Sequence, residues 1–117
     1  MPVSQREVTR VAHYFAIKQN DLLPVITDTL LYDDGDPIDL TAATVNFHMR
    51  VPGGSVKVDA AATVVSGTAG TVSYTWAAGD TDTVGEFDAE WEATIGGKTL
   101  TRPGSGYRRI RIDDDIA

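Results

Sequence analysis

The stretch TWAAGDTDTVGEFDAEWEA, residues 75–93, constrains the fold most tightly, because its second half alternates strictly between apolar and acidic side chains. The apolar side of the alternation is Phe87, Ala89, Trp91 and Ala93, and the acidic side is Glu86, Asp88, Glu90 and Glu92. A period of two is typical of a β-strand with one buried and one solvent-facing surface. The segment therefore predicts a strand that covers a hydrophobic core and turns an acidic face outward.

The same alternation recurs from about residue 11 to the end of the chain, with turn residues about every 8 to 12 positions, a spacing typical of a small sandwich or barrel. We expect an all-β fold: a single-domain immunoglobulin-like β-sandwich over residues 11–117, preceded by an extended N-terminal arm over residues 1–10. Beside the opening segment, strands are expected at Val11–Ile17, Leu22–Tyr32, Thr44–Val51, a run that resumes at Val56 and Val58, Ala61–Val65, Thr71–Trp76, Lys98–Arg102 and Tyr107–Ile112.

Local signals support this division of the chain. Ile95-Gly96-Gly97-Lys98 predicts a two-residue hairpin, because glycine readily adopts the positive φ that such turns need. Thr83-Val84-Gly85-Glu86-Phe87 resembles the corner at which immunoglobulin-like sandwiches cross between sheets, with Thr and Phe in place of Asp and Tyr. At the start of the chain, residues 8–15 also place apolar side chains at helical spacing, so a helical arm remains an alternative.

Length and charge limit the function classes. A chain of 117 residues is the size of one domain with one core. Seventeen acidic against ten basic residues give a net charge of -7, which disfavours binding to nucleic acid or to an anionic membrane. Cysteine is absent, which favours a reducing cytoplasm, and neither a signal peptide nor an apolar run of membrane-spanning length is visible. We expect protein partners, with no nucleic acid and no membrane.

No pattern of catalytic residues accompanies this composition. The two histidines, His13 and His48, lie far apart in sequence, and neither belongs to a paired-histidine metal motif. The glycines lie between expected strands and open no helix, so no phosphate-binding loop is predicted. A sandwich of this size seldom builds the cleft between two carboxylates that a glycosidase needs. We therefore expect a protein that is not an enzyme and has no catalytic, cofactor-binding or metal-binding residues.

Two binding alternatives rest on side chains with a simpler structural explanation. Aspartates at Asp33, Asp34, Asp36 and Asp39, and at Asp80 and Asp82, could offer oxygen ligands to Ca²⁺, although aspartate is also frequent in turns. Aromatic residues at Tyr74, Trp76, Trp91 and Tyr107 could form a sugar-stacking platform, although the spacing of the first three favours core packing. A calcium-binding or carbohydrate-binding β-module therefore remains a second alternative function.

Charge is segregated along the last third of the sequence. Acids gather at Asp80, Asp82, Glu86, Asp88, Glu90 and Glu92, and arginines follow at Arg102, Arg108, Arg109 and Arg111. If the two strands pair, their charges neutralise each other across the sheet. If they do not, they form complementary surfaces for docking to other copies or to a partner. The residues expected at such an interface are Arg6, Arg10, Glu86, Asp88, Glu90, Glu92, Arg108, Arg109 and Arg111.

Three stretches carry a resemblance to a known family: KQNDLLPVITDTLLYDDGDPIDLTAATVNFHMR (residues 18–50), GTVSYTWAAGDTDTVGEFDAEWEATIGGKTLTRP (residues 70–103) and YRRIRI (residues 107–112). The most telling pieces are Asp39-Leu40-Thr41, Tyr74-Thr75-Trp76 with Gly79-Asp80-Thr81, and Gly85-Glu86-Phe87 leading into Ala89-Glu90-Trp91. In this order they resemble the N-terminal domain of the upper baseplate protein family of tailed bacteriophages, over about residues 16–112.

The resemblance implies a β-rich module that attaches to a central virion hub and presents a C-terminal extension carrying receptor-binding proteins. The sequence ends at Ala117 without such a stalk, so we expect a non-enzymatic adaptor or decoration module that docks on tail (baseplate) proteins. Its expected partners are other phage virion proteins, namely the tail or baseplate hub or the major capsid protein, and further copies of itself in a symmetric homo-oligomer. The expected location is the virion, assembled in the host cytoplasm. The alternative is a capsid decoration or minor capsid protein that stabilises the phage head.

Overall fold

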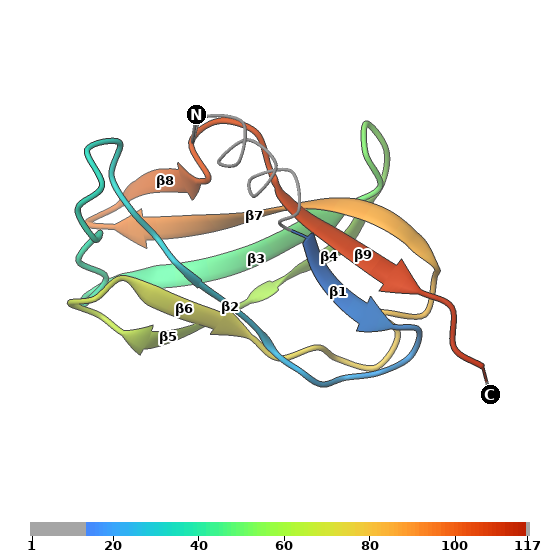
Figure 1. Cartoon of the computed structure of the whole chain (residues 1–117). Helices are drawn as coiled ribbons and strands as arrows, with labels where there is room; N and C mark the ends of the chain where they lie inside the picture. Colours follow the sequence, from blue (N-terminus) through green and yellow to red (C-terminus); the bar gives the residue numbers. More distant parts are fainter. Residues whose placement is uncertain (1–13, 117) are drawn as a thin grey trace, which may run out of the picture.

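The computed structural model of the chain describes residues 14–116, which form nine strands and no helix (Figure 1). The predicted arm over residues 1–10 lies outside the described residues, as do residues 11–13 at the start of the first predicted strand. The strands are β1 Tyr14–Lys18, β2 Ile26–Thr29, β3 Thr44–Arg50, β4 Val56–Ala61, β5 Thr63–Ser66, β6 Thr71–Tyr74, β7 Gly85–Ile95, β8 Lys98–Arg102 and β9 Arg108–Asp113. This part of the chain has no helix long and apolar enough to cross a membrane.

The larger sheet is built around β7, which has 11 residues and pairs with three neighbours. Antiparallel β3 follows most of one edge of β7, while the other edge is shared: β9 pairs with residues 85–89 and β8 with residues 91–95. The strand order is β1-β9-β7-β3-β4, with β1 parallel to β9 and every other pair antiparallel. Ile95 pairs with Lys98, so the Gly-Gly hairpin is confirmed.

The smaller sheet has the order β2-β6-β5 and lies against one face of the larger sheet (Figure 1). Apolar side chains from both sheets form one core cluster between them. The prediction of an all-β sandwich is therefore confirmed. The chain changes sheet twice in its middle part, once at Ala62 between β4 and β5 and once over residues 75–84 between β6 and β7, the connection in which the corner-like segment lies.

Phe47 of β3 lies at the centre of the core and is fully buried. Its ring stacks on Tyr74 with centroids 4.8 Å apart, lies edge-on to Trp76 at 5.7 Å, and meets Trp91 at 4.8 Å. Tyr74 belongs to the smaller sheet, Trp91 to the larger sheet, and Trp76 to the connection at residues 75–84, which we call the crossing segment. The ring of Phe47 therefore contacts all three parts of the fold. Offset and edge-on aromatic pairs add to the free energy gained by burying the rings.

The expected strand at Leu22–Tyr32 is wrong outside residues 26–29. Pro24 carries no backbone N–H, so it cannot donate to a sheet ladder. Beyond the strand, the N–H of Leu30 donates to the carbonyl of Gly70, and the chain then turns through a loop. The alternating apolar pattern of residues 22–32 therefore extends beyond residues 26–29, whose backbone groups pair in the sheet.

Other strand boundaries also differ from the prediction. The run from Ala61 divides at Ala62, whose N–H donates to the carbonyl of Val45, and the next strand belongs to the other sheet. The strand expected to reach Trp76 ends at Tyr74, and the last strand begins and ends one residue later than expected. The first two shifts occur where the chain leaves one sheet for the other, a change that the side-chain pattern does not mark.

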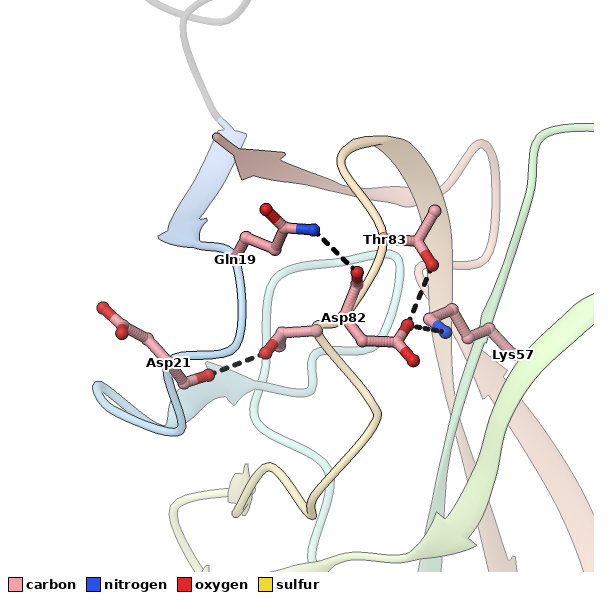
Figure 2. A network of polar contacts seen from close by, with 6 residues as sticks. Gln19, Asp21, Lys57, Asp82 and Thr83 are labelled. Carbon is pink, nitrogen blue, oxygen red and sulfur yellow. Dashed lines mark hydrogen bonds and ion pairs between the residues drawn. The ribbon is translucent and has the colours of Figure 1, made fainter. Parts of the chain in front are cut away.

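A polar network ties the loop after β1 to the crossing segment and to β4 (Figure 2). The amide of Gln19 donates to the carbonyl of Asp82 at 2.9 Å, and the hydroxyl of Thr81 donates to the carbonyl of Asp21 at 2.8 Å. The ammonium of Lys57 contacts Asp82 Oδ1 at 2.7 Å, and this bond is the main reason that the pKa of Asp82 lies below its usual value. The crossing segment is thus held from two sides.

Replacing Phe47 by Ala should lower the free energy of unfolding by about 3 to 5 kcal/mol, because it leaves a cavity that its three aromatic neighbours cannot close. Urea denaturation followed by tryptophan fluorescence measures the loss. Leu23→Ala is the matched control, since Leu23 is 73% exposed and its truncation should cost less than about 0.5 kcal/mol. A loss below about 1 kcal/mol for Phe47→Ala would contradict the central role of this ring.

Candidate interface surfaces

The segregated charges of the sequence meet inside the larger sheet, because β7 and β9 are neighbours. Glu86 pairs in register with Arg111, and Asp88 with Arg109. The guanidinium of Arg109 reaches both acids: Nη2 lies 3.0 Å from Glu86 Oε1, and Nε lies 3.2 Å from Asp88 Oδ1. The acidic strand β7 and the basic strand β9 are therefore paired in the sheet, and these charges neutralise each other across the strands.

The basic end of this face continues onto β1. The ring of Tyr14 lies 5.6 Å from the guanidinium carbons of both Arg109 and Arg111, within the range of cation–π attraction. Arg111 Nε also contacts Asp113 Oδ1 at 3.1 Å. An aromatic ring and carboxylates thus contact the two arginines, which leaves a nearly neutral strip along β1 and β9.

Glu90 and Glu92 form the other half of the acidic face and have no ion-pair partner among residues 14–116. Their neighbours on β3 are His48 opposite Glu90 and Asn46 opposite Glu92. Both glutamates are half-buried. A negative surface therefore remains on the outer side of β7 after the arginines of β9 have taken their partners.

A shallow hollow of about 280 Å³ lies beside Glu90 on this face. His48 Nε2 lies 3.2 Å from Asp59 Oδ1 at its wall, and Arg50 donates from Nη2 to the hydroxyl of Tyr107 at 3.0 Å across it. The hollow gathers charged side chains of both signs on an open surface. Such a surface suits contact with another protein better than enclosure of a small ligand.

Arg108 faces the opposite side of β9 and joins the two sheets. Its Nε lies 3.1 Å from both carboxylate oxygens of Asp28 on β2, and Asp28 Oδ2 also accepts the indole N–H of Trp91 at 2.8 Å. Trp91 is 1% exposed, so its N–H has no access to water and needs this acceptor. We call Asp28, Trp91 and Arg108 the cross-sheet clamp.

The clamp forms part of the wall of a groove of about 510 Å³ between the β2–β3 and β8–β9 connections. Arg102 borders the groove and donates from Nε to the carbonyl of Leu31 at 2.7 Å and from Nη1 to that of Thr101 at 2.8 Å. Three arginines and two aspartates line this groove, and Leu31, Pro103 and Tyr107 add apolar surface. The guanidinium of Arg109 pairs with Glu86 and Asp88 on the outer face, so Arg102 and Arg108 supply the positive charge of the groove.

The aspartates considered for calcium have structural partners. Asp39 accepts from the backbone and hydroxyl of Thr41, and the hydroxyl bond is the larger cause of its lowered pKa. Asp80 accepts from the hydroxyl of Tyr74 at 2.6 Å and from the N–H of Ala77 at 2.8 Å. Within residues 14–116, no group of three or more His, Cys, Asp or Glu side chains is placed to hold a metal ion.

Three of the four aromatic residues considered for sugar stacking are buried, namely Tyr74, Trp76 and Trp91. Trp76 donates its indole N–H to the carbonyl of Pro24 at 3.1 Å, and burial, with the bond to Asp80, raises the pKa of Tyr74. Tyr107 is half-exposed and its ring lies 5.2 Å from the guanidinium of Arg50. The buried rings pack the core and offer no platform to a sugar.

The sequence-predicted interface residues separate into three groups. Arg6 and Arg10 lie outside the described residues. Arg108 belongs to the cross-sheet clamp, and the remaining charges lie on the outer face of the larger sheet: Glu86, Asp88, Glu90, Glu92, Arg109 and Arg111. Sequence reasoning missed Asp28, because a single acid at an alternating position carries no sign that a distant arginine and tryptophan will bind it.

No protein-family model and no curated protein matches the sequence. Among solved structures, the chain is similar to the N-terminal domain of phage TP901-1 ORF48. The TM-score is 0.56 at 13% sequence identity, and the match covers 87% of this chain and 84% of the other.

The fold is that of a phage protein domain. The family resemblance that the sequence carries is therefore confirmed for the fold.

Replacing Asp28 by Ala should lower the free energy of unfolding by about 2 to 4 kcal/mol, because the buried indole N–H of Trp91 loses its acceptor and Arg108 loses its counter-charge. Asp28→Asn should cost less, since the amide oxygen can still accept from the indole. Asp59→Ala is the control: Asp59 is 68% exposed and should contribute less than about 0.5 kcal/mol. Equal urea midpoints for Asp28→Ala and the unmodified protein would show that the clamp adds no stability.

Proposed function

We propose that the protein is a non-enzymatic structural component of a phage virion, a small β-sandwich adaptor that docks on tail (baseplate) proteins. The observation that carries the proposal is the similarity to the N-terminal domain of phage TP901-1 ORF48, because it extends over 87% of this chain and 84% of that domain. Fold similarity alone does not determine function, so the surface must supply the rest of the argument.

The surface supports a role in protein contact. Most side chains that would serve a small ligand are used internally: Tyr74, Trp76 and Trp91 fill the core, and the carboxylates of Asp39 and Asp80 cap turns. What remains outside is a charged sheet face and an open groove. Charged open surfaces of this kind provide specificity and faster association between proteins.

The docking surface in this proposal is the outer face of β7, with Glu90 and Glu92 as its negative centre. Since no described residue pairs with these two acids, a basic surface on a baseplate protein could pair with them without first breaking an internal ion pair. Glu86, Arg109 and Arg111 form the rim, and Asp88, which is 9% exposed, serves as an ion-pair partner of Arg109. In this proposal residues 1–10 are an arm that precedes the domain at residues 11–117. Assembly takes place in the host cytoplasm.

Repetition would strengthen such a contact. A surface ion pair contributes only about 0 to 1 kcal/mol, so a single copy would dock weakly. In a symmetric virion assembly several copies bind at once, and the effective concentration of each further contact rises. This is the physical reason for proposing homo-oligomeric neighbours together with a hub protein as the partners.

Mass spectrometry of purified virions, after heads are separated from tails, tests the proposal. We expect the protein in the tail fraction at a copy number close to that of baseplate proteins and far below that of the major capsid protein. Hundreds of copies with the heads would instead assign it to capsid decoration, and absence from both fractions would contradict any virion role.

Reversing the two acids, Glu90→Lys with Glu92→Lys, should reduce incorporation into particles at least about tenfold while changing the melting temperature little, because half-buried surface charges without an ion-pair partner contribute little stability. Incorporation is measured in virions produced with the variant in place of the original protein. The double variant Asp21→Lys with Asp36→Lys changes net charge equally on exposed loops and should incorporate normally. A large fall in melting temperature with normal incorporation would assign the acids a role inside the fold.

A further inference from the structure

We propose that the acidic segment at residues 113–116 of one copy docks into the groove between the β2–β3 and β8–β9 connections of the next copy. The inference deepens the proposed function, because it identifies how neighbouring copies would contact each other. It can still fail by itself, since its test uses the purified protein without any virion component.

The groove offers guanidinium groups that are only partly used. Arg108 donates to Asp28 through Nε. No residue among 14–116 accepts a hydrogen bond from its two terminal nitrogens. Arg102 Nη2 lies 4.0 Å from Asp33 Oδ1, too far for a hydrogen bond. The planar fork of a guanidinium matches a carboxylate closely, so these nitrogens favour an acidic occupant.

Apolar surface lies beside these charges. Leu31 is 42% exposed and Tyr107 is 43% exposed, and both line the groove together with Pro103. Aromatic and aliphatic side chains next to arginine are a common composition of protein contact sites. The occupant should therefore combine carboxylates with at least one apolar side chain.

The segment after β9 has this composition. Asp114 and Asp115 are exposed, and no residue among 14–116 pairs with either carboxylate. Ile116 is 100% exposed. Two carboxylates followed by an apolar side chain complement two arginines beside apolar walls in charge and in polarity.

A molecule cannot fill its own groove with this segment. Arg108 stands at the first residue of β9 and Asp113 at the last, so the strand separates groove and segment by about 17 Å at about 3.3 Å per residue. The chain leaves the sandwich at that far end, away from β8 (Figure 1). Three further residues extend only about 10 Å, too short to return. The occupant must come from another copy.

A contact between one end of a molecule and a different surface of the next is heterologous. Such a contact forms a ring when the rotation between copies closes and a filament when it does not. A ring of adaptors around a tail would provide the repeated neighbours that the proposed function requires. Each contact is small, so the isolated protein should associate weakly and reversibly.

Sedimentation velocity of the purified protein, from about 10 µM to about 1 mM at low salt, tests the proposal, because charge contacts weaken as ions screen them. We expect concentration-dependent association that falls at least about tenfold in 0.5 M NaCl and at least about tenfold in the variant Asp114→Asn with Asp115→Asn. Both positions are exposed, so this variant should retain the fold, and its melting temperature verifies that. Asp21→Asn with Asp59→Asn, at two exposed positions that do not line the groove, is the charge-matched control and should associate like the original protein.

A second measurement locates the contact. A synthetic peptide with the sequence of residues 111–117 is titrated into isotope-labelled protein, and the indole N–H signal of Trp91 should shift, because Asp28 binds that N–H at the groove wall. The peptide with Asn at the two positions 114 and 115 should cause a shift at least about tenfold weaker at equal concentration. A protein that stays monomeric throughout, an Asn variant that associates normally, or shifts confined to the outer face of β7 would each overturn the proposal.

Discussion

The pairing of β7 with three neighbours is the constraint on which the rest of the structure depends. Its register fixes both faces at once, since side chains alternate with a period of two. A slip by one residue would place four acids in the core and expose Phe87 and Trp91 to water. Burying an unpaired carboxylate costs several kcal/mol, so the sequence strongly selects a single register. The sheet on either side of β7, and the position of Trp91 against Asp28, follow from that register.

The alternation of β7 and the Gly-Gly hairpin could be predicted from the sequence because both are local: one depends on a period of two and the other on glycine at two positions. Partners across the sheet could not, since Glu86 and Arg109 are 23 residues apart and Asp28 and Arg108 are 80 apart. The sequence gives the charge of each strand but does not specify which strands become neighbours in the sheet. For that reason the charge pattern alone is equally compatible with pairing inside the sheet and with docking, and the pairing of β7 with β9 decides between them.

The same reasoning explains why the candidate surface narrows within the structure. Six acids in one segment suggested one acidic face, yet the arginines of β9 reach only the half of β7 that pairs with them. Beyond Ala89 the edge of β7 passes from β9 to β8, whose outward residues opposite this region are threonines. Glu90 and Glu92 therefore keep their charge because of where one neighbour ends and the other begins. The strand order, more than the composition, determines what a partner would meet.

A fold shared at 13% identity also indicates where specificity must lie. A sandwich core accepts many combinations of apolar residues with suitable volume and alternation, so two domains can share it with few residues in common. The fold thus contributes little to the choice of partner. Leu31 and Ile116 are apolar and exposed, and Glu90 and Glu92 are charged and have no ion-pair partner within the described chain. Neither packing nor ion pairing inside residues 14–116 explains why these apolar side chains are exposed and these acids unpaired. Contacts with other molecules would explain both.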